Sequence, residues 1–230
     1  MFFRHNQDVL HRGKEGKLVS KRRQVIKEDV YDFTPCFYCD ALILKSNLLK
    51  HCKTCKACIE VKKQPRNLVQ KAEVRMKVKA GLIGEELGSV LEGLKNDAVG
   101  QTVLQDNLLL HYGQSLVDQQ LDSELYRYKD YLKQKMRESG DFLLKLREKS
   151  GHSTAPMEFF FHPKHWDLMV DVAKSFDSDG KKLKIGHLIG KICAVMCGIA
   201  MRQEDDNTYR SVQKVRQLYK DEWSIKVSSR

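Results

Sequence analysis

The sequence lacks the features that usually mark an exported or a catalytic protein. Its N-terminus, MFFRHNQDVLHR, contains no long apolar segment of the kind found in signal peptides. No nucleophile–base pair, glycine-rich phosphate loop or paired-carboxylate motif stands out, and most histidines are scattered singly along the chain. A lone histidine of this kind is usually structural. We therefore expect no catalytic residue and no small-molecule substrate.

Long apolar runs are also scarce. One such run extends over 185–201, and His187 and Lys191 interrupt it. Its unbroken part is too short to span a bilayer, so we predict a core helix there and no membrane partner. The full length of 230 residues is enough for one or two domains with a buried core.

Cysteine, by contrast, is concentrated in one place. Five of the seven cysteines lie within 36–58, and the spacing C-x2-C-x11-H-x3-C supplies the four ligands that a tetrahedral zinc site needs. A C-x2-C turn aims two thiolates at one point, and residues four apart share one face of a helix. Four protein ligands leave no open coordination position, so the ion would be structural. The predicted Zn²⁺ ligands of this small ββα-type, C2H2-type zinc finger are Cys36, Cys39, His51 and Cys55.

Other ligand sets fit the same stretch. Cys52 can replace His51 to give a four-cysteine frame, and Cys58 offers a third variant together with Cys55. We favour His51 because it falls three residues after Leu48, where the helix of a finger requires a ligand. A disulfide cluster is the competing interpretation, but paired cysteines in an intracellular chain more often bind metal.

The excess positive charge lies around these cysteines. The net charge of the whole chain is +11, and 45–79 alone have a net charge of +9. The residues before this block have a net charge of +2, and those from 80 onward have none. A localised basic block is typical of proteins that bind a phosphate backbone, although a solvated charged surface looks the same in sequence. The residues that we expect to contact DNA or RNA are Lys45, Asn47, Lys50, Lys53, Lys56, Lys62, Lys63 and Arg66.

Composition and spacing divide the chain into four parts. We predict a loose arm over 1–33, a zinc finger over 34–58, a basic and amphipathic helical connector over 59–96, and a helical bundle over 97–230. A Gly- and Pro-containing linker interrupts the bundle at 150–157. The fold class is therefore mainly α, with a small finger followed by an all-helical region.

Three local predictions go with this division. The apolar spacing over 97–119 favours one longer helix, with Gly113 as a candidate break. The final helix is expected over 206–222, and the alternation in 223–230 is typical of a strand. The basic triplet at 21–23 is the kind of sequence that directs nuclear import, so we expect a nuclear protein.

The order of these motifs resembles a known group of proteins. The segment PCFYCDALILKSNLLKHCKTC resembles the finger pattern PC-x2-C-x-G-Φ-Φ-x4-L-x2-H-x3-C, which opens a group of uncharacterised animal proteins related to Crypton-type tyrosine recombinases of mobile elements. Later segments resemble the helical blocks that follow the finger in those proteins; they are LLLHYGQSLVDQQ, YLKQKMRESGDFLLKLRE, HPKHWDLMVDVAKSFD and LKIGHLIGKICAVMCGIAMRQED.

The resemblance implies that 97–223 act like the helical core-binding domain with which a tyrosine recombinase clamps DNA. The catalytic domain of that class also needs an H-x-x-R motif, and no histidine here is followed by arginine at the third position. We therefore expect a non-catalytic, transposon-derived, DNA-binding protein. Two alternatives are a protein-interaction module, whose partner binds the helical region, and a fragment of a tyrosine recombinase.

Overall fold

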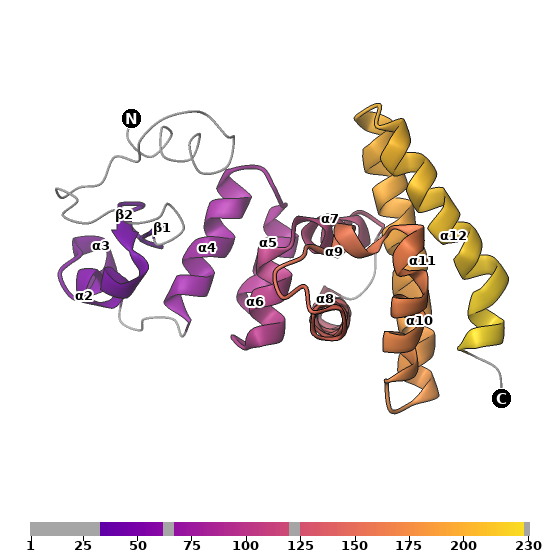
Figure 1. Cartoon of the computed structure of the whole chain (residues 1–230). Helices are drawn as coiled ribbons and strands as arrows, with labels where there is room; N and C mark the ends of the chain where they lie inside the picture. Colours follow the sequence, from indigo (N-terminus) through magenta and orange to yellow (C-terminus); the bar gives the residue numbers. More distant parts are fainter. Residues whose placement is uncertain (1–32, 62–66, 120–124, 228–230) are drawn as a thin grey trace. The chain divides into compact units, whose positions relative to one another are not determined.

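A computed structural model describes 33–61, 67–119 and 125–227, and these residues form two compact units that divide between Glu92 and Gly93 (Figure 1). The predicted fold class is confirmed, because the described residues contain one small sheet near the N-terminus followed only by helices. Apart from Phe33, the arm predicted over 1–33 lies outside the described residues.

The first unit begins with a two-stranded hairpin. Strands β1 (Phe33–Pro35) and β2 (Leu42–Leu44) pair antiparallel, with Phe33 opposite Leu44 and Pro35 opposite Leu42. Three short helical segments follow, namely η2 (Lys45–Asn47), α2 (Leu48–Cys52) and α3 (Lys56–Ile59). A hairpin and helices this short cannot bury enough apolar surface to be stable alone. The stability of the finger therefore depends on the side chains packed between the hairpin and the short helices.

Two longer helices complete the first unit. Helix α4 (Leu68–Lys79) packs against β1 and against α5 (Glu85–Glu92). The side-chain amide of Gln70 donates a hydrogen bond to the carbonyl oxygen of Leu91 at 2.9 Å. Gly88 allows the two helices to approach closely, because a Cβ atom there would lie 2.6 Å from Cγ2 of Val78. Helices α4 and α5 lie within the segment predicted as a connector, and α4 lies against the hairpin of the finger.

The described residues of the second unit form helices and the short segments that connect them. Its central helix α8 packs against α6, α7, α10 and α11, and α11 runs beside α12 (Figure 1). Buried apolar side chains from these helices form the core, among them Phe142, Leu143, Met169 and Ile189. The elements are α6 (Ala98–Gln105), α7 (Asn107–Asp118), α8 (Leu125–Ser150), α9 (Met157–Phe160), η3 (Pro163–His165), α10 (Trp166–Lys174), α11 (Asp179–Arg202) and α12 (Asp206–Lys226).

The single helix predicted over 97–119 is wrong, because the chain turns at Asp106. This residue has an extended backbone, and its carboxylate accepts hydrogen bonds from the N–H groups of Leu109 and Met157 at 2.9 Å and 2.7 Å. Asp106 therefore caps α7 and ties α9 to it. The first N–H groups of a helix have no hydrogen-bond partner within that helix, and an aspartate side chain can accept from them. Such an aspartate therefore begins a new helix at a point where apolar spacing alone predicts one continuous helix.

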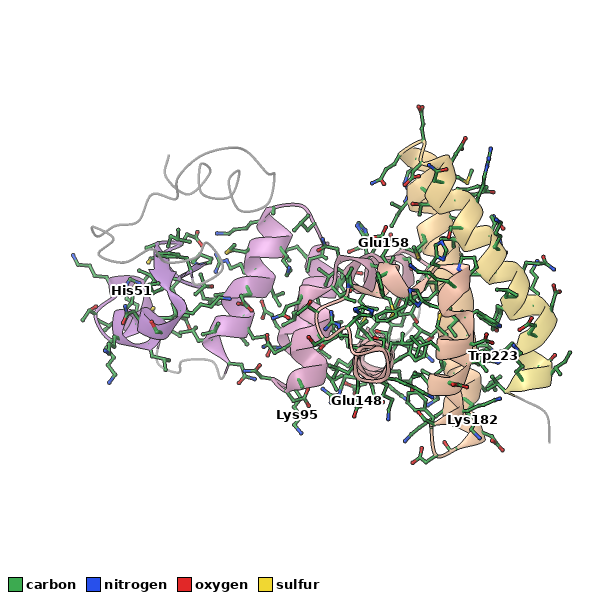
Figure 2. All side chains as sticks on the ribbon, viewed as in Figure 1. His51, Lys95, Glu148, Glu158, Lys182 and Trp223 are labelled. Atoms are coloured by element: carbon green, nitrogen blue, oxygen red, sulfur yellow. The ribbon has the colours of Figure 1, made fainter. Side chains whose placement is uncertain are left out.

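The strand predicted over 223–230 is also wrong within the described residues, because α12 continues to Lys226. Trp223 is buried against α11, where Gly186 leaves room for its indole ring (Figure 2). The indole of Trp166 donates a hydrogen bond to the carboxylate of Glu222 at 2.7 Å. These tertiary contacts keep the last turns helical although the local alternation favours a strand.

Among the described residues, α11 is long and apolar enough to cross a membrane by length and composition. Half of its most apolar 18-residue stretch is buried against neighbouring helices of the second unit. Length and composition do not separate a spanning helix from a core helix, and the buried residues of α11 lie in the core of this unit.

Candidate metal centre

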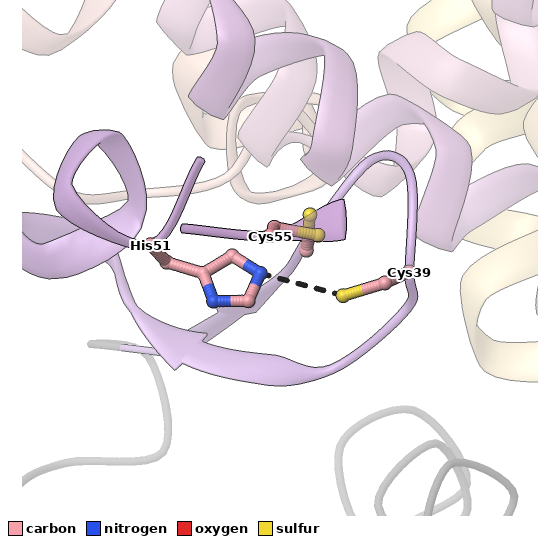
Figure 3. A group of neighbouring side chains, drawn as sticks. Cys39, His51 and Cys55 are labelled. Atoms are coloured by element: carbon pink, nitrogen blue, oxygen red, sulfur yellow. Dashed lines mark hydrogen bonds between the residues drawn. The ribbon is translucent and has the colours of Figure 1, made fainter. Parts of the chain in front are cut away.

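The four predicted ligands lie together in the finger. Their ligand atoms, the Sγ atoms of Cys36, Cys39 and Cys55 and a ring nitrogen of His51, all lie within 4.8 Å of one another. The Sγ atom of Cys39 is 3.3 Å from Nε2 of His51, and Figure 3 shows the Cys55 side chain beside this pair. Ligand atoms around one tetrahedral zinc ion lie roughly 3.8 Å apart when the Zn–S bonds are about 2.3 Å. The cluster therefore has the composition and spacing of a site that can hold a metal ion.

The hairpin turn fixes the first two ligands. Cys36 follows β1 directly, and its N–H donates to the carbonyl oxygen of Ala41 at 2.8 Å, while its own carbonyl accepts from Asp40 at 3.0 Å. Asp40 has a φ of +56°, a left-handed conformation that aspartate tolerates better than most residues. This tight turn brings Cys39 back toward Cys36, as a C-x2-C knuckle requires.

The second pair of ligands departs from the prediction in one respect. His51 lies in α2 as expected, but α2 ends at Cys52, and Cys55 is the N-cap residue of α3 with an extended backbone. The N–H of Cys55 still donates to the carbonyl oxygen of His51 at 2.9 Å. This single helical hydrogen bond preserves the spacing of one turn, so both side chains reach the cluster without sharing a continuous helix.

Cysteines make up most of the core of the finger. Leu48 and Leu68 are buried beside Cys36, Cys52, Cys55 and Cys58, and Phe37, Tyr38 and Ile43 pack around them. Leu48 is the apolar residue on which the choice of His51 rested. Because apolar side chains are so few here, we expect the metal ion to contribute much of the stability of this segment.

A second group of thiols adjoins the first. The Sγ atoms of Cys36, Cys52 and Cys58 also lie within 4.8 Å of one another, and those of Cys36 and Cys58 are 3.6 Å apart. All three residues are buried, with exposed fractions of 0%, 0% and 1%. Cys36 belongs to both groups, whereas Cys52 does not belong to the group that contains Cys39 and His51. The structure therefore groups His51, rather than Cys52, with Cys39.

Burial shifts the protonation of these thiols. Cys39 is exposed, but partial desolvation by the surrounding residues raises its pKa to about 12. Desolvation also raises the pKa of the buried thiols of Cys52 and Cys58. Burial acts in the same direction on Cys55, but hydrogen bonds from the Cys58 backbone and from neighbouring thiols outweigh it and lower the Cys55 pKa. Most of these thiols are neutral at pH 7 unless a cation replaces their protons, so metal binding would release protons.

Helix α4 holds the knuckle in place. The guanidinium of Arg75 donates to the carbonyl oxygen of Phe37 and lies over the ring of the same residue, with Cζ 4.9 Å from the ring centroid. Lys79 forms an ion pair with Asp40, and Glu73 forms one with Lys45 at 2.6 Å. Arg75 and Lys79 belong to the basic block over 45–79 that predicts phosphate binding, but in the structure both contact the finger.

The predicted nucleic-acid residues fall into three groups. Asn47, Lys50, Lys53 and Lys56 are exposed on the finger. Lys45 is half-buried and paired with Glu73. Lys62, Lys63 and Arg66 lie outside the described residues.

Comparisons of this chain with protein-family models, with curated proteins and with solved structures gave no match. The function is therefore inferred from the residues of the finger and from the distribution of charge. The Cys/His cluster itself is consistent with a zinc-binding module.

Proposed function

We propose that the finger binds a structural zinc ion and that the protein binds nucleic acid through the finger. The observation that carries the proposal is the convergence of Cys36, Cys39, His51 and Cys55, whose ligand atoms lie within 4.8 Å of one another. Three thiolates and one imidazole form a soft tetrahedral set that suits zinc better than calcium or magnesium, which prefer oxygen ligands.

The nucleic-acid part of the proposal rests on exposed lysine side chains of the finger. Lys50, Lys53 and Lys56 are exposed on or beside α2 and α3, in the segment that holds the largest excess of positive charge. The second unit, with 22 basic and 19 acidic residues over 93–230, has a net charge of only +3, and many of its lysines pair with carboxylates, such as Lys184 with Glu138 at 3.0 Å. The finger therefore offers the phosphate-binding surface.

A single finger buries little surface, so it would act as an additional contact rather than as the reader of a long sequence. A nuclear, non-catalytic protein of mobile-element origin fits this proposal. In that case the second unit would derive from the core-binding region of a recombinase, while the phosphate contacts lie on the finger. The alternative is that this unit binds a protein partner while the finger has only a structural role.

The test is a charge reversal on the finger. The variant K50E/K53E/K56E should bind a DNA duplex at least tenfold more weakly than wild type at low salt. The slope of log K against log salt concentration should also become shallower, because each phosphate contact contributes about 0.9 to the magnitude of that slope. Fluorescence anisotropy with labelled duplex DNA and with single-stranded RNA measures both quantities.

The matched control changes the same net charge elsewhere. Arg210, Lys214 and Lys220 are exposed on α12, so R210E/K214E/K220E should leave the affinity within about twofold of wild type. Equal loss of affinity in both variants, or no binding by the wild type at low salt, would contradict the proposal. Arg75 and Lys79 are unsuitable for this test because they hold the knuckle.

A further inference from the structure

The cysteines of the finger outnumber the ligands of one zinc ion. A single tetrahedral site uses Cys36, Cys39, Cys55 and His51, which leaves Cys52 and Cys58 unassigned. Both are buried, and their Sγ atoms lie within 4.8 Å of Cys36 Sγ. The distance of 3.6 Å between the Sγ atoms of Cys36 and Cys58 is close to the roughly 3.8 Å between two thiolates on one zinc ion.

The two groups share one cysteine, and a second cysteine adjoins both. Cys36 belongs to both groups. The Sγ atom of Cys55 lies within 4.8 Å of that of Cys36, and its thiol interacts with the Cys58 thiol, but Cys55 is not one of the three mutually close thiols of the second group. When Cys36 and Cys55 each bridge two ions, the five thiolates and His51 provide four bonds to each ion. One ion then has three thiolates and an imidazole, and the other has four thiolates.

The charge balance also permits a second divalent ion. A single Zn²⁺ ion with three thiolates has a net charge of −1, and two Zn²⁺ ions with five thiolates have the same net charge. The second ion therefore adds no net charge to a buried site. Exposed Lys50, Lys53 and Lys56 belong to the same small unit and carry charge of the opposite sign.

The surroundings favour thiolate coordination over water. Leu48 and Leu68 are buried in the same cluster, and the rings of Phe37 and Tyr38 pack against it. An ion in the group of Cys36, Cys52 and Cys58 is therefore bound by sulfur and shielded from solvent, which soft-metal sites tolerate and magnesium or calcium sites do not.

We infer that the finger holds two zinc ions in one thiolate-bridged cluster, with Cys36, Cys52 and Cys58 as ligands of the second ion and Cys55 as its fourth ligand. This inference rests on the proposed zinc site and adds a second ion to it. It assigns Cys52 and Cys58 a metal-binding role beside His51, whereas the alternative frames use them as replacements for other ligands.

The experiment counts zinc ions per chain by native mass spectrometry of the full-length protein loaded with zinc. Wild type should hold two zinc ions, and C52S/C58S should hold one. The control C193S changes a buried thiol of the second unit and should still hold two. One zinc ion in both wild type and C52S/C58S would overturn this inference and leave the proposed zinc site intact, whereas no zinc in wild type would overturn both.

A second measurement on wild type avoids any folding defect of the variant. In the protein loaded with ¹¹³Cd²⁺, NMR should show two resonances of equal intensity, one from a four-thiolate site and one from a site with three thiolates and an imidazole. A single resonance would overturn the two-ion cluster. A disulfide between Cys36 and Cys58 in the metal-loaded protein, detected by mass, would overturn it as well.

Discussion

At the scale of single residues, the finger and the helical unit depend on a few polar groups whose partners lie far apart in sequence. Arg75 and Lys79 hold the hairpin from a helix more than thirty residues away. Asp97 accepts two hydrogen bonds from Arg137, at 3.0 Å and 2.9 Å, and a third from the N–H of Gly100 at 2.9 Å. Asp97 therefore caps α6 and joins it to α8 through a bidentate ion pair.

The first prediction concerns the pH dependence of this ion pair. The Arg137 guanidinium, helped by the Gly100 N–H, lowers the pKa of Asp97 to about 2. A lowered carboxyl pKa stabilises the folded state above the ordinary pKa, and this contribution is lost as pH falls from about 4 to about 2. D97N should therefore unfold at lower urea concentration than wild type at pH 7, and the difference should shrink across that interval.

Tryptophan fluorescence measures this transition in the relevant unit, because both tryptophans, Trp166 and Trp223, lie in the second unit. The control D177N removes a carboxylate whose pKa is also lowered, by Lys181, but which is fully exposed and should change stability little. A difference between wild type and D97N that stays constant from pH 7 to pH 2 would show that the ion pair does not contribute.

The four residues of the Cys/His cluster could be predicted from sequence to lie together, and the contacts around them could not. The spacing of Cys36, Cys39, His51 and Cys55 contains the information, because four zinc ligands must fall at intervals that short secondary structures can bring together. The contacts of Arg75 and Lys79 could not be predicted in this way. A basic helix face that is exposed to solvent has the same composition as one that contacts a neighbouring turn. Long-range pairing is decided by tertiary structure.

At the scale of elements, the main lesson is that apolar spacing predicts the presence of helices better than their ends. Asp106 divides the predicted helix over 97–119 because its carboxylate caps α7 and accepts a hydrogen bond from the N–H of Met157, 51 residues later. Helix α12 extends past the predicted end because Trp223 packs on α11. In both places a contact with a distant segment decides a boundary that local sequence leaves open.

The second prediction concerns the close packing of α11 and α12. A Cβ atom at Gly186 would lie 2.6 Å from the indole nitrogen of Trp223 and 2.7 Å from the adjoining ring carbon. G186A should therefore lower the free energy of unfolding by about 1–3 kcal/mol, as overpacked cores do. Thermal unfolding followed by circular dichroism measures the loss.

The control for this substitution lies on the same helix. At Gly198 the nearest atom to an added Cβ is the mobile guanidinium of Arg202, at 3.4 Å. G198A should be neutral or should stabilise by up to about 1 kcal/mol, because alanine is the better helix former. Equal behaviour of G186A and G198A would contradict the packing of Trp223 on Gly186.

At the scale of the whole molecule, charge and metal ligands are segregated from the helical core. The Cys/His cluster and the exposed lysines of the finger lie in the first unit, which ends at Glu92. The second unit has its own apolar core and a net charge of only +3 over 93–230, against +9 over 45–79. The two units should therefore respond differently when metal is removed.

The measurement that tests the central claim most directly is a Co²⁺ titration of the metal-free full-length chain. The account predicts the intense visible absorption of tetrahedral Co²⁺ with thiolate-to-metal charge transfer in wild type, displaced by zinc. The absorption should weaken in C39S and in H51A, while the tryptophan fluorescence of the second unit stays unchanged. A pale octahedral spectrum in wild type, or an unchanged tetrahedral spectrum in both variants, would contradict the proposed metal centre.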